Sequence, residues 1–213
     1  MKTYPKIETQ SEEFIGRSCF AFQKLDGTNL RCEWNRKRGW YKFGTRNNMI
    51  DEKNPQFGEA ITIFLDKYGD DLTKIFKESY SNVESIVVFS EYCGENSFAG
   101  LHFDEPKDVI LFDVNLYKRG FITPKEFIQN FGDLHIPKLI YKGEYNSDLI
   151  QKVRNNDFDL KEGVICKGVH RDEVWMTKIK TKEWLERVKN KLGEKALLEE
   201  LNNDRRLLNE YQK

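Results

Sequence analysis

The chain has 213 residues, a length that fits one large domain or one domain with a small appendage. Charged residues make up 33% of it and only 5 residues are proline, so the composition excludes a disordered chain. The formal net charge at pH 7 is +0, which excludes a strong global attraction to nucleic acid but leaves room for a local basic groove.

The cysteines and the N-terminus predict a reducing, cytoplasmic environment. No two cysteines form a Cys-x-x-Cys pair, and each lies among strand-like residues, which favours reduced, half-buried thiols over a zinc site. The N-terminal residues lack the apolar stretch of a signal peptide, and no apolar run approaches the length that spans a membrane. We therefore expect no membrane association. The cysteines are Cys19, Cys32, Cys93 and Cys166.

In chain order, the first predicted elements are a strand, a hairpin and a helical region. Residues 18–24 read as a strand that ends at an Asp-Gly turn, and residues 29–35 and 40–45 read as a hairpin around a basic turn. Residues 56–79 read as two helical stretches, because apolar residues recur there at helical spacing. One apolar face is formed by Ile61, Phe64, Leu65 and Tyr68.

Strands and short helices alternate in the middle of the chain. The helix predicted over residues 123–130 begins with threonine, proline and a nearby glutamate, a pattern typical of a helix N-terminus. A second helix, over residues 146–156, begins with an Asn-Ser cap. The strands predicted around these helices cover residues 85–91, 108–116, 162–167 and 174–180.

The C-terminal residues read as helix and define the predicted domain boundary. Residues 1–180 form the expected main domain, and residues 181–213 form a helical extension. The resulting fold class is α+β, with mostly antiparallel sheet. We expect the extension to pack on the main domain and to serve stability rather than the chemistry of the active site. Its predicted apolar face contains Trp184, Leu185, Val188 and Leu192, and resumes after Gly193 with Leu197, Leu201 and Leu208.

The motif that carries chemistry begins at Lys24, in the run Lys-Leu-Asp-Gly-Thr-Asn. One interpretation is an Asp-Gly hairpin turn with an incidental lysine. The other is a lysine nucleophile held where a strand ends, beside a turn with exposed backbone N–H groups. A free lysine has a pKa near ~10.4, so a neighbouring cation must release its amine for attack on a phosphate.

Other elements follow Lys24 in a fixed order, and together they are more specific than any one of them. They are Arg46, Glu91, the Phe112-Asp113 pair, the Glu162-Gly163 pair, and Lys178 with Lys180. Over residues 18–184 the sequence resembles the covalent nucleotidyltransferase superfamily of DNA ligases, RNA ligases and mRNA capping enzymes. The resemblance implies an antiparallel-sheet nucleotidyltransferase domain of the ATP-grasp-like ligase type.

In this interpretation, four residues carry the phosphate chemistry. Lys24 becomes lysyl-AMP, and Glu162 holds a divalent metal, Mg²⁺ or Mn²⁺. Lys178 and Lys180 alternate with one residue between them, so they share a strand face and neutralise the α-phosphate and the departing pyrophosphate. The alternative for Glu162 is a charged residue that only marks the start of a strand. The alternative for Lys178 and Lys180 is a solvent-exposed strand edge that carries basic residues.

Five further residues are expected to hold the nucleotide and the substrate end. Phe112 stacks on adenine and Glu91 accepts hydrogen bonds from the ribose, although a core phenylalanine and a surface carboxylate remain the alternatives. Arg46 contacts the donor 5′-phosphate or the AMP phosphate. Gln23 reads the adenine edge. Asn29 orients phosphate or metal ligands.

Within the superfamily, the sequence looks most like the T4 RNA ligase 2 type of RNA ligase. The shared features are the Lys-Leu-Asp-Gly-Thr-Asn run, the glycine-rich stretch over residues 89–100, the strand containing Phe112-Asp113 and the helix start near residue 123. Capping enzymes and most DNA ligases carry an OB-fold domain after the last lysine motif. An OB-fold needs five strands, and the residues after Lys180 read as helix, so the sequence favours an RNA ligase over these enzymes. The type often carries an appended C-terminal domain, and from the helical pattern of residues 181–213 we expect none here.

The resemblance implies an ATP-dependent RNA ligase that joins 3′-hydroxyl and 5′-phosphate ends of RNA. ATP and Mg²⁺ or Mn²⁺ are the implied cofactors, and we expect a cytoplasmic monomer, which a phage or virus could encode. A minimal ATP-dependent DNA ligase and a non-catalytic module that binds nucleic-acid ends remain alternatives, because contacts to a 2′-hydroxyl are not visible in a sequence.

Overall fold

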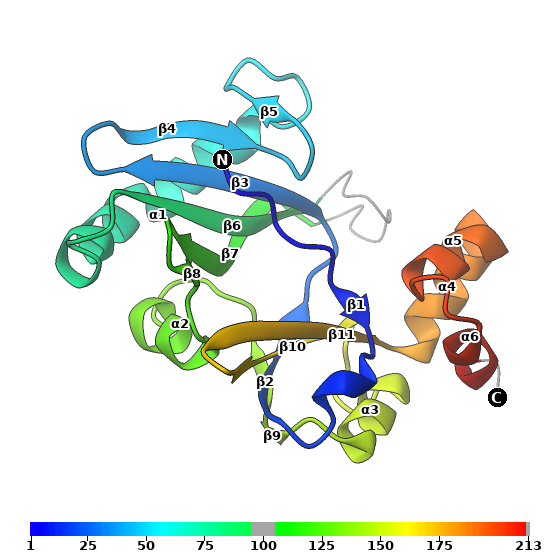
Figure 1. Ribbon diagram of the computed structural model, residues 1–213. Coiled ribbons are helices and arrows are strands. Elements are labelled where there is room, and N and C mark those ends of the chain that lie inside the picture. The colour runs from blue at the N-terminus through cyan, green and yellow to red at the C-terminus, as the bar shows by residue number, and fades with distance from the viewer. Residues whose placement is uncertain (95–104, 212–213) are drawn as a thin grey trace. The chain divides into compact units, whose positions relative to one another are not determined.

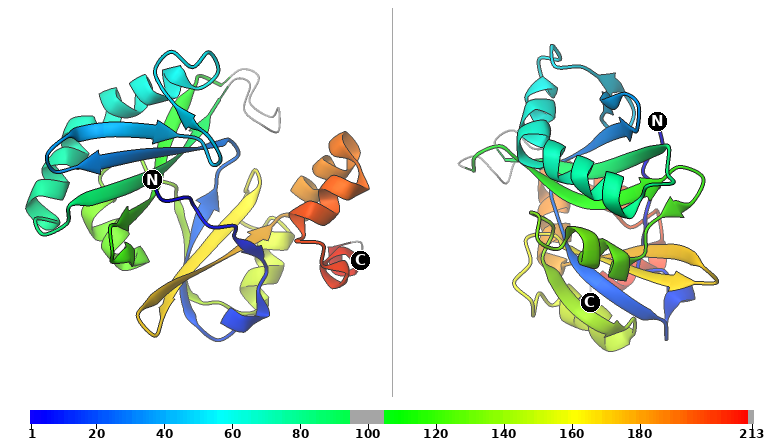
Figure 2. Two further views of the ribbon diagram at one scale, coloured as in Figure 1. Left: turned by 45° about the horizontal axis from the view of Figure 1, so that its top comes forward. Right: turned by 90° about the vertical axis from the view of Figure 1, so that its left-hand side faces the viewer.

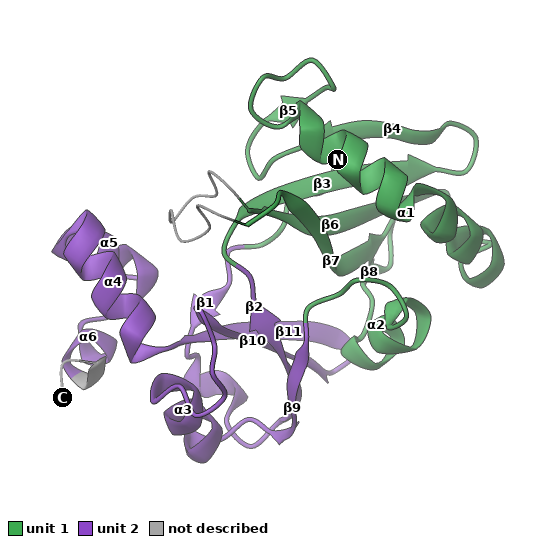
Figure 3. Ribbon diagram, turned by 180° about the vertical axis from the view of Figure 1, so that it is seen from behind, with its two compact units in different colours: residues 1–5, 26–137 green, residues 6–25, 138–213 purple. Residues whose placement is uncertain are grey.

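A computed structural model describes residues 1–94 and 105–211 (Figure 1). The chain divides into two compact units (Figure 3). Unit 1 contains Met1–Pro5 and Asp26–Pro137, and unit 2 contains Lys6–Leu25 and Lys138–Lys213. The predicted helical extension therefore lies within unit 2. Of the glycine-rich stretch predicted over residues 89–100, residues 95–100 lie outside the described residues.

Unit 1 is built on a six-stranded antiparallel sheet. Its strand order is β5-β4-β3-β6-β7-β8, so the predicted hairpin and the next two predicted strands are direct neighbours. In the central strands β3 and β6, five consecutive residues are buried, so both faces of the sheet are covered there. The strands are β3 (Thr28–Asn35), β4 (Gly39–Gly44), β5 (Met49–Ile50), β6 (Ser85–Cys93), β7 (Asp108–Leu116) and β8 (Gly120–Phe121).

One long helix, α1 (Gly58–Ser79), lies along this sheet (Figure 2). The prediction of two helical stretches here was wrong, because buried residues recur at three- and four-residue steps without a break. The Tyr68 hydroxyl donates to the carbonyl oxygen of Val109 on β7 at 2.8 Å, which fixes the helix to the sheet. The buried residues of this helix include Ala60, Ile61, Phe64, Leu72 and Phe76.

The second helix of unit 1, α2 (Pro124–Phe131), begins as predicted. The Thr123 side chain accepts a hydrogen bond from the backbone N–H of Glu126, and Pro124 occupies the first helical turn.

Thr123→Ala is expected to lower the free energy of unfolding by about 1 kcal/mol, because the cap acceptor is lost. Chemical denaturation measures this. Thr123→Ser keeps the acceptor, and an equal loss in both variants would contradict the capping role.

Unit 2 is built on a five-stranded sheet with the order β1-β11-β10-β2-β9. All pairs are antiparallel except β1 with β11, which is parallel. β9 was not predicted, because its side chains are half-exposed or exposed and show no apolar alternation. A 3-10 turn, η1, covers Glu12–Phe14. The strands are β1 (Glu8–Thr9), β2 (Ser18–Lys24), β9 (Leu139–Glu144), β10 (Gly163–His170) and β11 (Glu173–Lys180).

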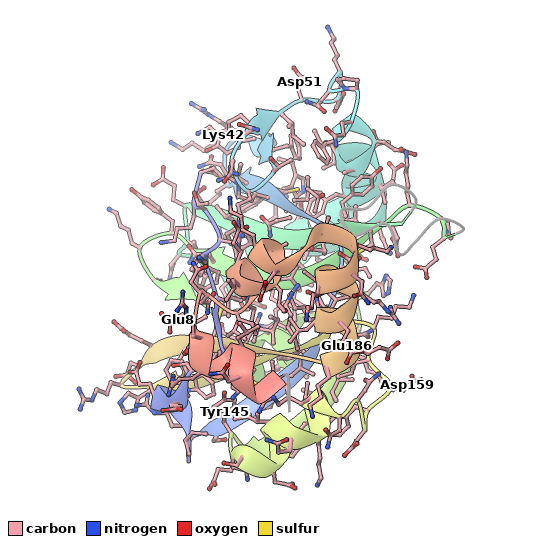
Figure 4. The ribbon with its side chains drawn as sticks, turned by 90° about the vertical axis from the view of Figure 1, so that its right-hand side faces the viewer. Glu8, Lys42, Asp51, Tyr145, Asp159 and Glu186 are labelled. Carbon is pink, nitrogen blue, oxygen red and sulfur yellow. The ribbon has the colours of Figure 1, made fainter. Side chains whose placement is uncertain are left out.

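Helix α3 (Ser147–Arg154) closes the core of unit 2. The side chain of Asn146 caps it by accepting from the backbone N–H of Leu149, as the sequence predicted. Tyr145, which precedes the helix, is fully buried (Figure 4). The core around it contains Cys19, Ala21, Leu149, Val153, Val164, Cys166, Trp175 and Ile179.

Three short helices form the C-terminal extension: α4 (Lys182–Leu192), α5 (Glu194–Glu200) and α6 (Arg205–Tyr211). Trp184, Leu185 and Val188 are buried as predicted, while Glu186 lies on the exposed side of α4 (Figure 4). Leu192 is 59% exposed, which contradicts the predicted face. The reason is Gly193, whose φ of 86° ends α4 and turns the chain.

The structure confirms the α+β class with mostly antiparallel sheet. No strand follows β11 in the described part of the chain. Among the described residues, no helix combines the length and the apolar character needed to cross a membrane. None of the four cysteines, all within the described residues, forms a disulfide, but Cys19, Cys32 and Cys166 are fully buried rather than half-buried.

Candidate active site

Three predicted site residues of unit 2 meet because of strand register. Gly163 begins the middle strand β10 and lies opposite both Lys24 at the end of β2 and Lys180 at the end of β11. Gly163 has a φ of 157°, and a Cβ there would collide with the carbonyl oxygen of Ile179. Glycine is therefore required for the close approach of the strands that places Glu162 beside both lysines.

Glu162 is a buried carboxylate shared by two lysines. Its Oε1 lies 2.9 Å from Lys24 Nζ and 2.5 Å from Lys180 Nζ, and its side chain is only 3% exposed. Burial opposes ionisation of this group, yet the ammonium groups of Lys24 and Lys180 hold its pKa below the ordinary value. The carboxylate is therefore charged at neutral pH and fixes the positions of both amines.

Lys178 extends this cluster along the same face of β11. It lies two residues before Lys180, opposite Ile165 of β10, and its side chain is 14% exposed. Burial, followed by repulsion from Lys180, lowers the pKa of Lys178 to about 8. The predicted pairing of the two lysines on one face is confirmed.

Glu200, at the end of α5, completes the cluster and was missed by sequence reasoning. Its Oε2 lies 2.5 Å from Lys180 Nζ and 3.8 Å from Lys178 Nζ. Burial opposes its ionisation, but Lys180 holds its pKa below the ordinary value. No motif in the sequence marks this one carboxylate as different from the other acidic residues of the extension.

Gln23 and Lys24 lie on opposite faces of β2. Neighbouring residues alternate along a strand, and Gln23 lies opposite Val164, which belongs to the core beneath α3. Gln23 is half-buried, and its backbone N–H donates to the carbonyl oxygen of Lys138. The register therefore does not bring Gln23 to the face that carries the lysines.

In unit 1, register brings Asn29 and Glu91 together. They are direct partners across β3 and β6, so their side chains share one sheet face. The turn before β3 packs tightly against β6, because a Cβ at Gly27 would collide with the carbonyl oxygen of Tyr92. Asn29 Oδ1 is buried and has no hydrogen-bond partner, so it is an acceptor available to a ligand.

Phe112 is half-buried and packs against Tyr4, another residue that sequence reasoning missed. The two ring centroids lie 5.0 Å apart, edge to face, and the Tyr4 hydroxyl donates to Asp113 Oδ2 at 2.8 Å. Burial, reinforced by Asp113, raises the pKa of Tyr4 well above its ordinary value, so the phenol stays a donor. The pairing of β6 with β7 shifts register between Phe89 and Ser90. Phe89 lies opposite Asp113 and Ser90 lies opposite Leu111, so Phe112 is the extra residue of a β-bulge.

Arg46 lies on the surface of unit 1, in the turn between β4 and β5. Its guanidinium is exposed, and Nη2 donates to the carbonyl oxygen of Pro5 at 3.4 Å. An exposed guanidinium keeps most of its fork of donors open to a phosphate.

Glu162 could also hold a metal ion. Its second oxygen, Oε2, is buried and has no hydrogen-bond partner. The described residues contain no group of three or more His, Cys, Asp or Glu placed to hold a metal. One carboxylate oxygen completed by water and phosphate oxygens suits Mg²⁺, which is often held in proteins by one or two carboxylates.

A family model described as RNA ligase matches residues 17–201 of this chain. A search of curated proteins found no match. Among solved structures, an RNA ligase mutant from Naegleria gruberi with AMP and Mn aligns with a TM-score of 0.67 and 16% identity, over 90% of this chain and 59% of that chain.

The same enzyme appears in other states among the solved structures. The Naegleria gruberi RNA ligase with PPi aligns with a TM-score of 0.66 and 17% identity, over 90% and 59% of the two chains. A mutant with ATP and Mn aligns with a TM-score of 0.66 and 17% identity, over 90% and 58%. At this identity the likeness shows the fold, and the chain spans about three fifths of the length of these structures.

Proposed function

This chain belongs to the RNA ligase family, whose model matches residues 17–201, and from that premise we propose that it is an ATP-dependent RNA ligase. The observation that carries the proposal is the buried cluster of Lys24, Glu162 and Lys180, joined by contacts of 2.9 and 2.5 Å. A lysine held at a fixed position among further cations suits attack on a polyphosphate.

The first step forms a covalent adenylate on Lys24. After Lys24 has lost a proton to solvent, its amine nitrogen attacks the α-phosphorus of ATP and a nitrogen–phosphorus bond forms. The nitrogen gives a second proton to solvent, and the bond to the oxygen that bridges the β-phosphorus breaks. Pyrophosphate leaves with that electron pair. Glu162 Oε1 orients the amine through its 2.9 Å contact, and Lys178 and Lys180 offset the negative charge of the phosphates.

Two further transfers seal the RNA. AMP passes from Lys24 to the 5′-phosphate end of the RNA, and the 3′-hydroxyl then displaces AMP to form the new phosphodiester. Each step is a phosphoryl transfer in which positioning and charge neutralisation provide most of the catalysis.

Four further residues are proposed to contact the nucleoside and the RNA end. Half-buried Phe112, held by Tyr4, offers a ring to adenine, and Glu91 offers a carboxylate to the ribose hydroxyls. Asn29 Oδ1 is an unused acceptor on the same face as Glu91. Exposed Arg46 is proposed to bind the phosphate of the RNA end.

A divalent cation, Mg²⁺ or Mn²⁺, fits Oε2 of Glu162, which is buried and has no hydrogen-bond partner. Bound there, it would offset charge on the phosphate oxygens. The support comes from the similar RNA ligase solved with ATP and Mn, and from the buried carboxylate oxygen without a partner.

The test of the proposal is incubation with ATP labelled at the α-phosphate and Mg²⁺, followed by denaturing electrophoresis. Covalent label on the chain is expected. Absence of label would favour a non-catalytic module that binds RNA ends. A nick with ribose at the 3′-hydroxyl should be sealed faster than one with deoxyribose, and the reverse preference would identify a DNA ligase.

Binding of inorganic pyrophosphate should weaken as pH rises through about 8. Lys178 is charged below its pKa of about 8 and neutral above it, so only the low-pH form attracts an anion. Its charged neighbours are Lys180, Glu200, Lys24 and Glu162.

Calorimetric titration across pH 7–10 measures this dependence. Lys178→Arg is the matched control, because a guanidinium stays charged throughout and any titration of pyrophosphate itself is common to both proteins. Identical pH profiles for the two proteins would contradict a role for Lys178 in anion binding.

A further inference from the structure

Lys180 lies between two carboxylates that come from different parts of the chain. Glu162, at the start of β10, and Glu200, at the end of α5, each place one oxygen 2.5 Å from Lys180 Nζ. With both carboxylates in place, the Lys180 side chain is only 2% exposed. An external phosphate oxygen therefore cannot reach this ammonium while Glu200 stays where it is.

The packing of the extension fixes Glu200 in this position. The carbonyl oxygen of Glu200 accepts a hydrogen bond from Thr9 Oγ1 at 2.7 Å, which ties the end of α5 to β1. The flanking residues Leu197 and Leu201 are buried. The carboxylate is thus part of a docked helix and not a freely moving surface group.

Glu200 contacts the two lysines that the proposed mechanism assigns to phosphate. Its carboxylate is 2.5 Å from Lys180 and 3.8 Å from Lys178, whereas the nucleophile Lys24 pairs with Glu162. A carboxylate oxygen and a phosphate oxygen make the same kind of charged hydrogen bond to an ammonium group. The two anions therefore compete for the same donors.

We propose that Glu200 competes with the phosphates of the nucleotide for Lys178 and Lys180 and thereby sets the affinity for ATP and pyrophosphate. This inference rests on the proposed function. Binding of the nucleotide displaces the carboxylate, so phosphate binding and docking of α5 oppose each other. By thermodynamic linkage, if the docked Glu200 lowers the affinity for phosphate by some factor, bound phosphate must lower the equilibrium constant for docking of Glu200 by the same factor.

The test compares Glu200→Gln with wild type in calorimetric titrations with inorganic pyrophosphate. The carboxamide keeps the size of the side chain but loses its charge, so pyrophosphate should bind about tenfold more tightly, within the usual range for coupled sites. Glu199→Gln is the matched control, because Glu199 is the exposed neighbour on the same helix, and its affinity should equal that of wild type. Unchanged or weaker binding by Glu200→Gln would overturn the proposal.

A second measurement uses only the wild-type chain and so does not depend on how the variant folds. Hydrogen exchange of the backbone amides at residues 197–204 should become faster when pyrophosphate is added, because the tie between α5 and the lysines is lost. Slower or unchanged exchange at saturating pyrophosphate would overturn the competition.

Failure of the proposed competition by Glu200 can be distinguished from failure of the proposed ligase function. Covalent AMP labelling of wild type tests the ligase chemistry without reference to Glu200. Labelling together with unchanged pyrophosphate affinity in Glu200→Gln would overturn the inference and leave the ligase chemistry standing. Absence of labelling would overturn the proposed function whatever Glu200 does.

Discussion

Lys24→Ala is expected to reduce covalent AMP labelling below detection, because the amine that forms the bond to phosphorus is removed. No other lysine in the cluster can replace it. The side chain of Lys180 is only 2% exposed, between two carboxylates. Lys178 lies opposite Ile165, two residues along β10 from Gly163, which is the register partner of Lys24. Denaturing electrophoresis after reaction with α-labelled ATP measures the effect. Lys24→Arg should be equally inactive, because arginine keeps the charge beside Glu162 but stays protonated.

The control for Lys24 is Lys142→Ala. Lys142 lies on β9, the other neighbour of β2, and its side chain is exposed, so labelling should equal that of wild type. Label that persists on Lys24→Ala would place the nucleophile elsewhere in the chain. Loss of label in Lys142→Ala as well would point to general damage to unit 2.

Strand ends could be predicted from the sequence because the motifs coincide with them. β2 ends at Lys24 as predicted, since the continuous apolar run Cys19–Phe22 is followed there by an Asp-Gly turn. β7 covers the predicted residues 108–116. β9 could not be predicted, because its apolar residues are consecutive, the rest are Lys, Gly and Glu, and no alternation marks it as a strand apart from its pairing with β2.

The composition of the charged cluster could be predicted only in part. Lys24, Glu162 and Lys180 stand at motif positions, and strand register then brings them together. Glu200 and Tyr4 could not be found in the same way, because each reaches its partner through tertiary packing between segments far apart in the sequence. Nothing local distinguishes Glu200 from exposed Glu199, and only the docking of α5 does so.

The second large effect is expected for Glu162→Gln, which should slow AMP transfer to Lys24 by about 10²–10³-fold. The carboxamide keeps the shape of the side chain but loses the charge that fixes both Lys24 and Lys180. The rate constant is measured in a single turnover with α-labelled ATP. Glu200 still pairs with Lys180 in this variant, so the buried ammonium keeps one counter-charge and the fold should survive.

The dependence on metal concentration separates the two proposed tasks of Glu162. If Oε2 holds the cation, Glu162→Gln must require a higher Mg²⁺ concentration for half-maximal rate than wild type, in addition to the lower maximum. If the residue acts only through the lysines, the maximum falls while the Mg²⁺ midpoint stays unchanged, and the metal assignment fails. A maximal rate within tenfold of wild type would contradict both tasks and make Glu162 a structural counter-charge for Lys180.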